Sequence, residues 1–210
     1  MSLSFPIYSR YERQADAVIH VLGVTASLIG SAWLLYAAEL KLATSLAIYA
    51  AGLVAMLSAS ALYNLTPPGR RKEILRRVDH AMIFVMIAGS YTPYTIHRLD
   101  SQVGLALCVA VWLVAVAGIV LKVGYPRRFD RLGVLLYLAM GWMVVFAIDP
   151  LAASVSDTTF TLLFIGGAVY SAGVVFHLVE RVPFHNAIWH GCVLVAATLH
   201  FTAMSGEFIV

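Results

Sequence analysis

Long apolar runs alternate with short polar segments along almost the whole chain. Seven runs come near the length of about 20 residues that a helix needs to cross the hydrocarbon core of a bilayer. They cover residues 18–38, 42–65, 78–97, 102–123, 132–149, 158–179 and 186–206. Only helices and closed barrels satisfy their backbone inside lipid, and runs this uniformly apolar are typical of helices. The pattern predicts an all-α integral membrane protein, a seven-transmembrane helix bundle.

Composition supports this prediction and indicates which kind of partner the protein binds. The 210 residues are 61% hydrophobic and 12% charged, whereas soluble domains are nearer half apolar and a quarter charged. The net charge of +3 is spread over short loops, which favours anionic lipid headgroups and argues against a nucleic-acid partner. Cys108 and Cys192 lie inside apolar runs, so we expect packed thiols and no disulfide framework.

The basic residues predict the direction of the bundle. With seven spans, 12 of the 14 Lys and Arg residues fall on the side of the N-terminus, and only Lys41 and Arg98 fall on the other. Positive charge concentrates on the cytoplasmic side of membrane proteins. We therefore expect a cytoplasmic N-terminal segment at residues 1–17, a seven-span domain at 18–206 and a short outer tail at 207–210, with the C-terminus outside.

Polar residues inside the spans gather at the predicted cytoplasmic end. Ionisable residues in membrane helices are costly and by default mark a site or a pathway. Three pairs are four residues apart, so each pair shares one helix face and can aim two ligands at one metal or substrate. These pairs are Asp16 with His20, Ser60 with Asn64, and Asn186 with His190.

Several of these groups also have a purely structural interpretation. Asp16 and His20 could pair with each other at a helix start. His177 and His185 lie at loop boundaries, where headgroup-facing positions are expected, and His97 fits an outer surface. His200 lies about 15 Å beyond His190 along a helix and fits a buried, hydrogen-bonded histidine.

Asp79 and His80 open the third run, and two interpretations of Asp79 remain. In the first, Asp79 faces a polar pocket shared with Asn64, His190 and His20. In the second, Asp79 is an N-terminal acid stabilised by the helix dipole and by Arg76 and Arg77.

Four segments together resemble the hemolysin III family, the bacterial branch of the progestin and adipoQ receptor superfamily. They are "ERQADAVIHVLG" (12–23), "SALYN" (60–64), "LRRVDHAMIFVMIAGSYTPY" (75–94) and "NAIWHGCVLVAATLH" (186–200). The match runs in order over nearly the whole chain. The resemblance implies a multi-pass protein of the bacterial plasma (inner) membrane with a cytoplasmic N-terminus.

The resemblance also implies a zinc site near the cytoplasmic leaflet. Family members use one histidine ligand in the second span, in an S-x-x-x-H motif, and two in an H-x-x-x-H motif in the seventh. Carried over, Ser60 keeps the serine position, whereas Asn64 and Asn186 replace two of the three ligands and His190 keeps the third. Asp79 takes the place of the family aspartate that assists the metal's water, so Asp79 and Ser60 are the candidate catalytic residues.

The two asparagines matter because an amide oxygen is a poorer zinc donor than imidazole. Three interpretations remain. Zinc binds through His190 and Asp79, with His20 or His80 as a substitute ligand. A harder cation binds instead. Otherwise no metal binds, and the cluster is a hydrogen-bonded polar core.

The sequence therefore supports two main functions. The first is a sensor or regulator of membrane or lipid homeostasis that binds a lipid-like ligand and needs no intact metal site. The alternative is a metal-dependent lipid amide hydrolase, resembling ceramidases. An ion or proton transporter is less favoured because no continuous polar path is visible, and a circulating cytolysin is less favoured because seven apolar spans need lipid. The sequence does not specify a substrate or an oligomeric state.

Overall fold

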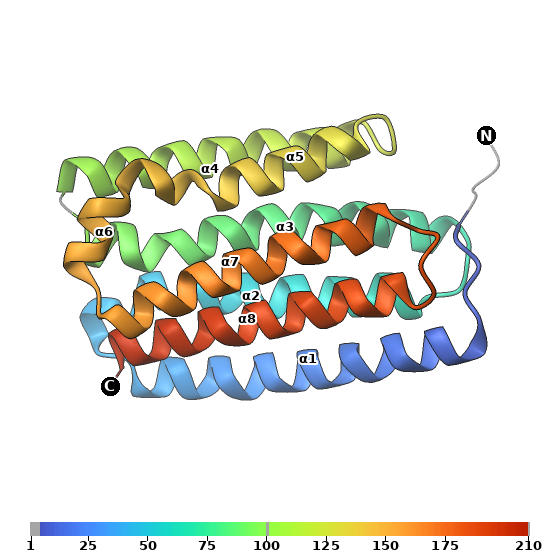
Figure 1. The fold of residues 1–210 in the computed structure, drawn as a ribbon, viewed down its shortest axis with the longest axis horizontal. Coiled ribbons are helices and arrows are strands. Elements are labelled where there is room, and N and C mark those ends of the chain that lie inside the picture. Colours follow the sequence, from blue (N-terminus) through green and yellow to red (C-terminus); the bar gives the residue numbers. More distant parts are fainter. Residues whose placement is uncertain (1–4, 100, 210) are drawn as a thin grey trace.

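The computed structural model describes residues 5–99 and 101–209, and within them all regular structure is helical. Long helices run antiparallel, side by side (Figure 1). The elements are α1 (Arg10–Ala37), α2 (Leu40–Leu65), α3 (Arg70–His97), α4 (Ser101–Gly124), α5 (Asp130–Gly141), the 3₁₀ segment η1 (Met143–Ala147), α6 (Ile148–Ser154), α7 (Asp157–Leu178) and α8 (His185–Phe208). We call the end where α1, α3, α5 and α8 begin the N-terminal end of the bundle, and the opposite end the C-terminal end.

Among the described residues, six helical segments are long and apolar enough to cross a membrane, which confirms most of the predicted span pattern. They are α1, α2, α4, the continuous column of α5, η1 and α6, α7 and α8. The remaining predicted span lies in α3, which equals α1 in length at 28 residues but begins with a strongly basic turn. α3 packs mainly against α2 and α4, so part of its surface faces protein rather than lipid.

Hydropathy located the spans, but α1 and α3 begin earlier in the chain than the predicted spans do. α1 begins at Arg10, eight residues before the predicted span, because Ser9 and Glu12 form a capping box. α3 begins at Arg70, so Asp79 lies in the third turn rather than at the helix mouth. The reason is general: hydropathy marks the apolar stretch, whereas a helix continues into the polar interface wherever its end is capped.

The predicted outer tail is also part of the fold. α8 extends to Phe208, and the Glu207 carboxylate accepts a hydrogen bond of 2.6 Å from Arg98 Nε. Glu207 Oε2 also accepts from the Ser156 backbone N–H at 3.2 Å. These contacts tie the C-terminal ends of α3 and α8 to the start of α7.

The fifth column is interrupted midway, and side chains from two neighbouring helices satisfy the break. The Tyr91 hydroxyl donates to Gly141 O at 2.7 Å and accepts from the Val144 backbone N–H at 2.9 Å. Trp142 Nε1 donates to Ser171 Oγ on α7 at 3.0 Å. The Tyr91 hydroxyl therefore pairs backbone groups of α5 and η1 at the point where the regular helical hydrogen bonds end.

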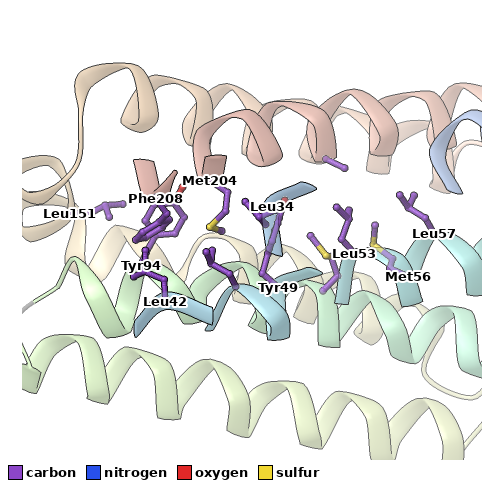
Figure 2. Packing of buried hydrophobic residues seen from close by; sticks show 13 residues of the cluster. Leu34, Leu42, Tyr49, Leu53, Met56, Leu57, Tyr94, Leu151, Met204 and Phe208 are labelled. Carbon is purple, nitrogen blue, oxygen red and sulfur yellow. The ribbon is translucent and has the colours of Figure 1, made fainter. Parts of the chain in front are cut away.

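Most of the apolar core fills the middle and the C-terminal half of the bundle. One cluster, drawn in Figure 2, joins α1, α2, α3 and α8 around Leu34, Leu46 and Tyr49, all of which are fully buried. A second cluster joins α3, α4 and α5 around Phe84 and Val111. The N-terminal end is left to polar side chains.

Candidate functional site

Asp16, His20 and His190 meet at the N-terminal end of the bundle. His190 Nδ1 lies 2.5 Å from Asp16 Oδ1, and His20 Nε2 lies 3.4 Å from Asp16 Oδ2. The two imidazole rings are 4.5 Å apart between centroids. All three residues are buried, and one ligand atom from each lies within 4.8 Å of the others. We call these residues the Asp16 cluster; its carboxylate and two imidazoles form a donor set that suits zinc.

The structure joins these residues across α1 and α8 through Glu12. Asp16 and His20 are one turn apart and share a face of α1, and Glu12 lies one turn earlier on that helix. Glu12 Oε2 accepts from the Ser9 N–H at 2.8 Å, and Oε1 accepts from the Phe184 N–H at 2.9 Å. Phe184 is the left-handed residue (φ 59°) that precedes α8. Glu12 thereby fixes the start of α8 beside α1, with His190 opposite Asp16.

Glu12→Ala is expected to weaken metal binding by at most about 10-fold, the low end of the range for an outer partner, because Glu12 bonds Ser9 and Phe184 and no residue of the Asp16 cluster. The substitution removes the capping box and the hydrogen bond to the Phe184 N–H, so the start of α8 is held less firmly beside α1. Zinc affinity measured by competition with a chelating dye checks this. Glu39→Ala is the matched control, because Glu39 precedes α2 at the C-terminal end and its carboxylate pairs with exposed Lys41. An affinity unchanged by Glu12→Ala would contradict the positioning role.

The ligand positions carried over from the resemblance form a separate amide pair. Asn186 Nδ2 donates to Asn64 Oδ1 at 3.5 Å, and Asn64 Nδ2 donates to Ser60 O at 3.0 Å. The two amides therefore satisfy each other and the α2 backbone. Of the predicted ligands, the structure brings His190 and the substitute His20 together beside Asp16, whereas the two asparagines hydrogen-bond to each other.

Asp79 and His80 pair with each other rather than joining the Asp16 cluster. His80 Nδ1 lies 3.1 Å from Asp79 Oδ2, and both side chains are largely buried. The dipole interpretation of Asp79 is wrong, because dipole stabilisation falls off within the first turn and Asp79 lies in the third. Arg76 instead binds Asp130 at 2.5 Å. Asp79 lies close enough to Ser60 and His190 to interact with both.

The remaining histidines occupy four different settings. His185 is buried and its ring lies 5.7 Å from that of Tyr8, which contradicts the headgroup-facing prediction. His177 is half-buried against Trp189. His97 Nε2 lies 2.9 Å from Ser45 Oγ, so it is bound to α2 rather than free on a surface. His200 binds Leu163 O at 3.1 Å, which confirms the hydrogen-bonded role.

A cavity of about 1240 Å³ runs through the bundle, and the Asp16 cluster lines one end of it. Asp79, Asn64 and Asn186 line the same end. Further in, the wall becomes mainly apolar, with Met86, Leu107, Leu151 and Phe164 among its residues. A polar end and an apolar interior match the two parts of an amphipathic lipid.

Charged residues surround the N-terminal end of this cavity. Arg127 binds Glu73 at 2.7 Å, and this hydrogen bond raises the pKa of the Arg127 guanidinium. Lys122 binds Asp130 at 3.1 Å. Phe5, in the segment before α1, lies 5.2 Å from the Arg127 guanidinium, so this segment also contributes to the wall.

Asp16 is the residue that the sequence interpretation undervalued. Its signal was present, because Glu12, Asp16 and His20 recur every four residues and share a helix face. The resemblance directed the ligand assignment to α2 instead. Only the three-dimensional structure shows that this face of α1 meets His190 of α8.

An antiparallel helical bundle with six apolar spans and a buried carboxylate–imidazole group defines a multi-pass membrane protein with a site that could hold a metal. The chain belongs to the Haemolysin-III related family, whose family model matches residues 11–201. It is 38% identical to the hemolysin-3 homolog of Bacillus subtilis (strain 168), over 90% of this chain and 91% of the relative. It is 31% identical to the hemolysin-3 of Bacillus cereus, over 90% and 89% of the two chains. It is also 28% identical to the human monocyte to macrophage differentiation factor, over 92% and 83%.

Proposed function

We propose that this protein is a metal-dependent hydrolase that cleaves a lipid amide inside the membrane. The observation that carries the proposal is the Asp16 cluster at the polar end of the cavity. Two imidazoles and a carboxylate are a ligand set found in catalytic zinc sites, where a further position stays open to water or substrate. A bound zinc ion would polarise the amide carbonyl and make water more acidic.

The chain's own residues supply the rest of the site. Asp79, with Ser60 beside it, lies in the cavity wall and is the candidate to orient water and accept its proton. The apolar interior would hold the acyl chain of the substrate, and the charged N-terminal end its polar head. The amide pair of Asn64 and Asn186 offers donors and acceptors to that head.

The proposal includes the orientation of the bundle. We place seven spans in the plasma membrane of a bacterium, with α3 as the third span and the N-terminal end in the cytoplasm. The distribution of charge supports this, since α1, α3, α5 and the 124–131 loop carry their Lys and Arg residues at that end. α3 reaches about 42 Å, long enough to cross a bilayer, and is shielded by α2 and α4.

The test is hydrolysis of a defined substrate by the purified protein in lipid nanodiscs. Ceramide with an isotope-labelled acyl chain is supplied, and released fatty acid is measured by mass spectrometry. We expect release that stops after chelation, returns with zinc and is lost in His190→Ala. His97→Ala, at the C-terminal end, should retain it. Bound ceramide without release under any of these metal conditions would overturn the enzymatic proposal.

That last outcome would favour the second candidate function, a lipid sensor or regulator. One observation supports it: Asp16 already binds His190 and Asn64 already binds Asn186, so part of the polar end is hydrogen-bonded without any metal. Histidines titrate near neutral pH, so such a cluster could respond to protons as well as to a lipid.

A further inference from the structure

The deep part of the cavity carries hydroxyl groups that the proposed reaction does not use. Tyr94 of α3 is only 5% exposed and lines the cavity, yet its hydroxyl has no hydrogen-bond partner among the described residues. Tyr49 of α2 is fully buried in the same apolar cluster, and its hydroxyl is also unpartnered there (Figure 2). A buried hydroxyl without a partner costs free energy, so the Tyr94 hydroxyl, which lines the cavity, points to a polar ligand group in this part of the cavity.

Two further polar side chains line the cavity in this region. The His200 ring meets Tyr170 edge-on, with centroids 5.6 Å apart. His200 Nε2 donates to Leu163 O, so Nδ1 carries a lone pair that can accept a hydrogen bond.

The chemistry of this region favours a neutral group. Every Lys, Arg, Asp and Glu among the described residues of the cavity wall lies at the N-terminal end. A carboxylate or phosphate would therefore find no cation here. A hydroxyl fits, because it can donate to His200 Nδ1 and accept from a tyrosine hydroxyl.

We propose that Tyr170 and His200 form a second binding site, deep in the cavity, that hydrogen-bonds a neutral hydroxyl group on the acyl chain of the lipid. The proposal rests on the proposed binding of a lipid in this cavity. His200 lies ten residues beyond His190 on α8, or about 15 Å. A lipid whose head lies at the Asp16 cluster would thus present a hydroxyl from the middle of its chain, and not one next to its head.

The test compares three fatty acids that differ only in their hydroxyl group. Stearate, 2-hydroxystearate and 12-hydroxystearate are titrated by calorimetry into the purified full-length protein in detergent. We expect 12-hydroxystearate to bind about 3–10-fold more tightly than stearate, the gain from one neutral hydrogen bond. 2-Hydroxystearate should have no such advantage. Tyr170→Phe and His200→Leu should lose the preference and bind stearate as the wild type does.

The outcomes separate this inference from the proposal on which it rests. Equal affinity of the wild type for stearate and 12-hydroxystearate would overturn the second site and leave lipid binding intact. A preference that survives in Tyr170→Phe and His200→Leu would also overturn it. If none of the three fatty acids binds, lipid binding in the cavity fails, and the second site fails with it. Tyr170→Phe removes one oxygen only, so a folding defect is not expected, and thermal unfolding of the variant checks this.

Discussion

Replacing Asp16 with asparagine is expected to lower the zinc affinity of the purified protein by at least about 100-fold, because losing even an outer partner costs 10–100-fold. The Asp16 carboxylate contacts both histidines of the cluster, at 2.5 Å and 3.4 Å. An amide in its place removes the negative charge and offers zinc only a weak oxygen donor. Metal content by elemental mass spectrometry and affinity by dye competition measure the effect.

The matched control removes the two positions that the resemblance assigned to the metal. The Asn64→Ala/Asn186→Ala double variant breaks the amide pair of α2 and α8 and keeps all three residues of the Asp16 cluster. We expect it to keep its zinc. Zinc lost from the double variant but kept by Asp16→Asn would mean that the asparagines are the ligands and that the Asp16 cluster is a hydrogen-bonded core.

The contrast between these two sets shows what sequence reasoning can and cannot reach. Hydropathy and charge order the polar groups by depth, which is why Asp16, Asn64 and His190 were all expected near one end. Depth does not specify how far each helix is rotated about its axis. Asp16 and His190 are 174 residues apart in the chain, and their contact depends on the rotation of α1 and α8 that Glu12 and Phe184 fix.

In the fold as well, features that depend on hydropathy could be predicted, and features that depend on contacts between distant residues could not. Six apolar spans could be predicted because each is a long run of apolar residues, and the apolar interior of the bilayer is enough to account for such a run. α3 was predicted too short, because its first two turns are held by protein contacts such as Glu73 with Arg127. The break after Gly141 was not predicted. It depends on the Tyr91 hydroxyl, 50 residues away in the sequence, taking over two backbone bonds.

Asp79→Asn is expected to lower kcat for lipid amide hydrolysis by about 10²–10⁴-fold, the contribution typical of a general base. Asp79 lines the cavity and lies close enough to Ser60 and His190 to interact with both, yet stands outside the Asp16 cluster. Zinc content should therefore stay at the wild-type level. Asp149→Asn, an exposed aspartate of α6 at the C-terminal end, is the matched control and should change neither quantity.

Measuring kcat and zinc together separates three roles of Asp79. Loss of activity with zinc retained supports proton transfer, and Asp79→Glu should then restore part of the rate because it returns a carboxylate. Loss of both would make Asp79 a ligand beside His190, as one interpretation of the sequence held. Unchanged activity with a lower melting temperature would reduce Asp79 to a structural partner of His80, 3.1 Å away. In that case the hydrolase proposal would lose the carboxylate that it assigns as the base.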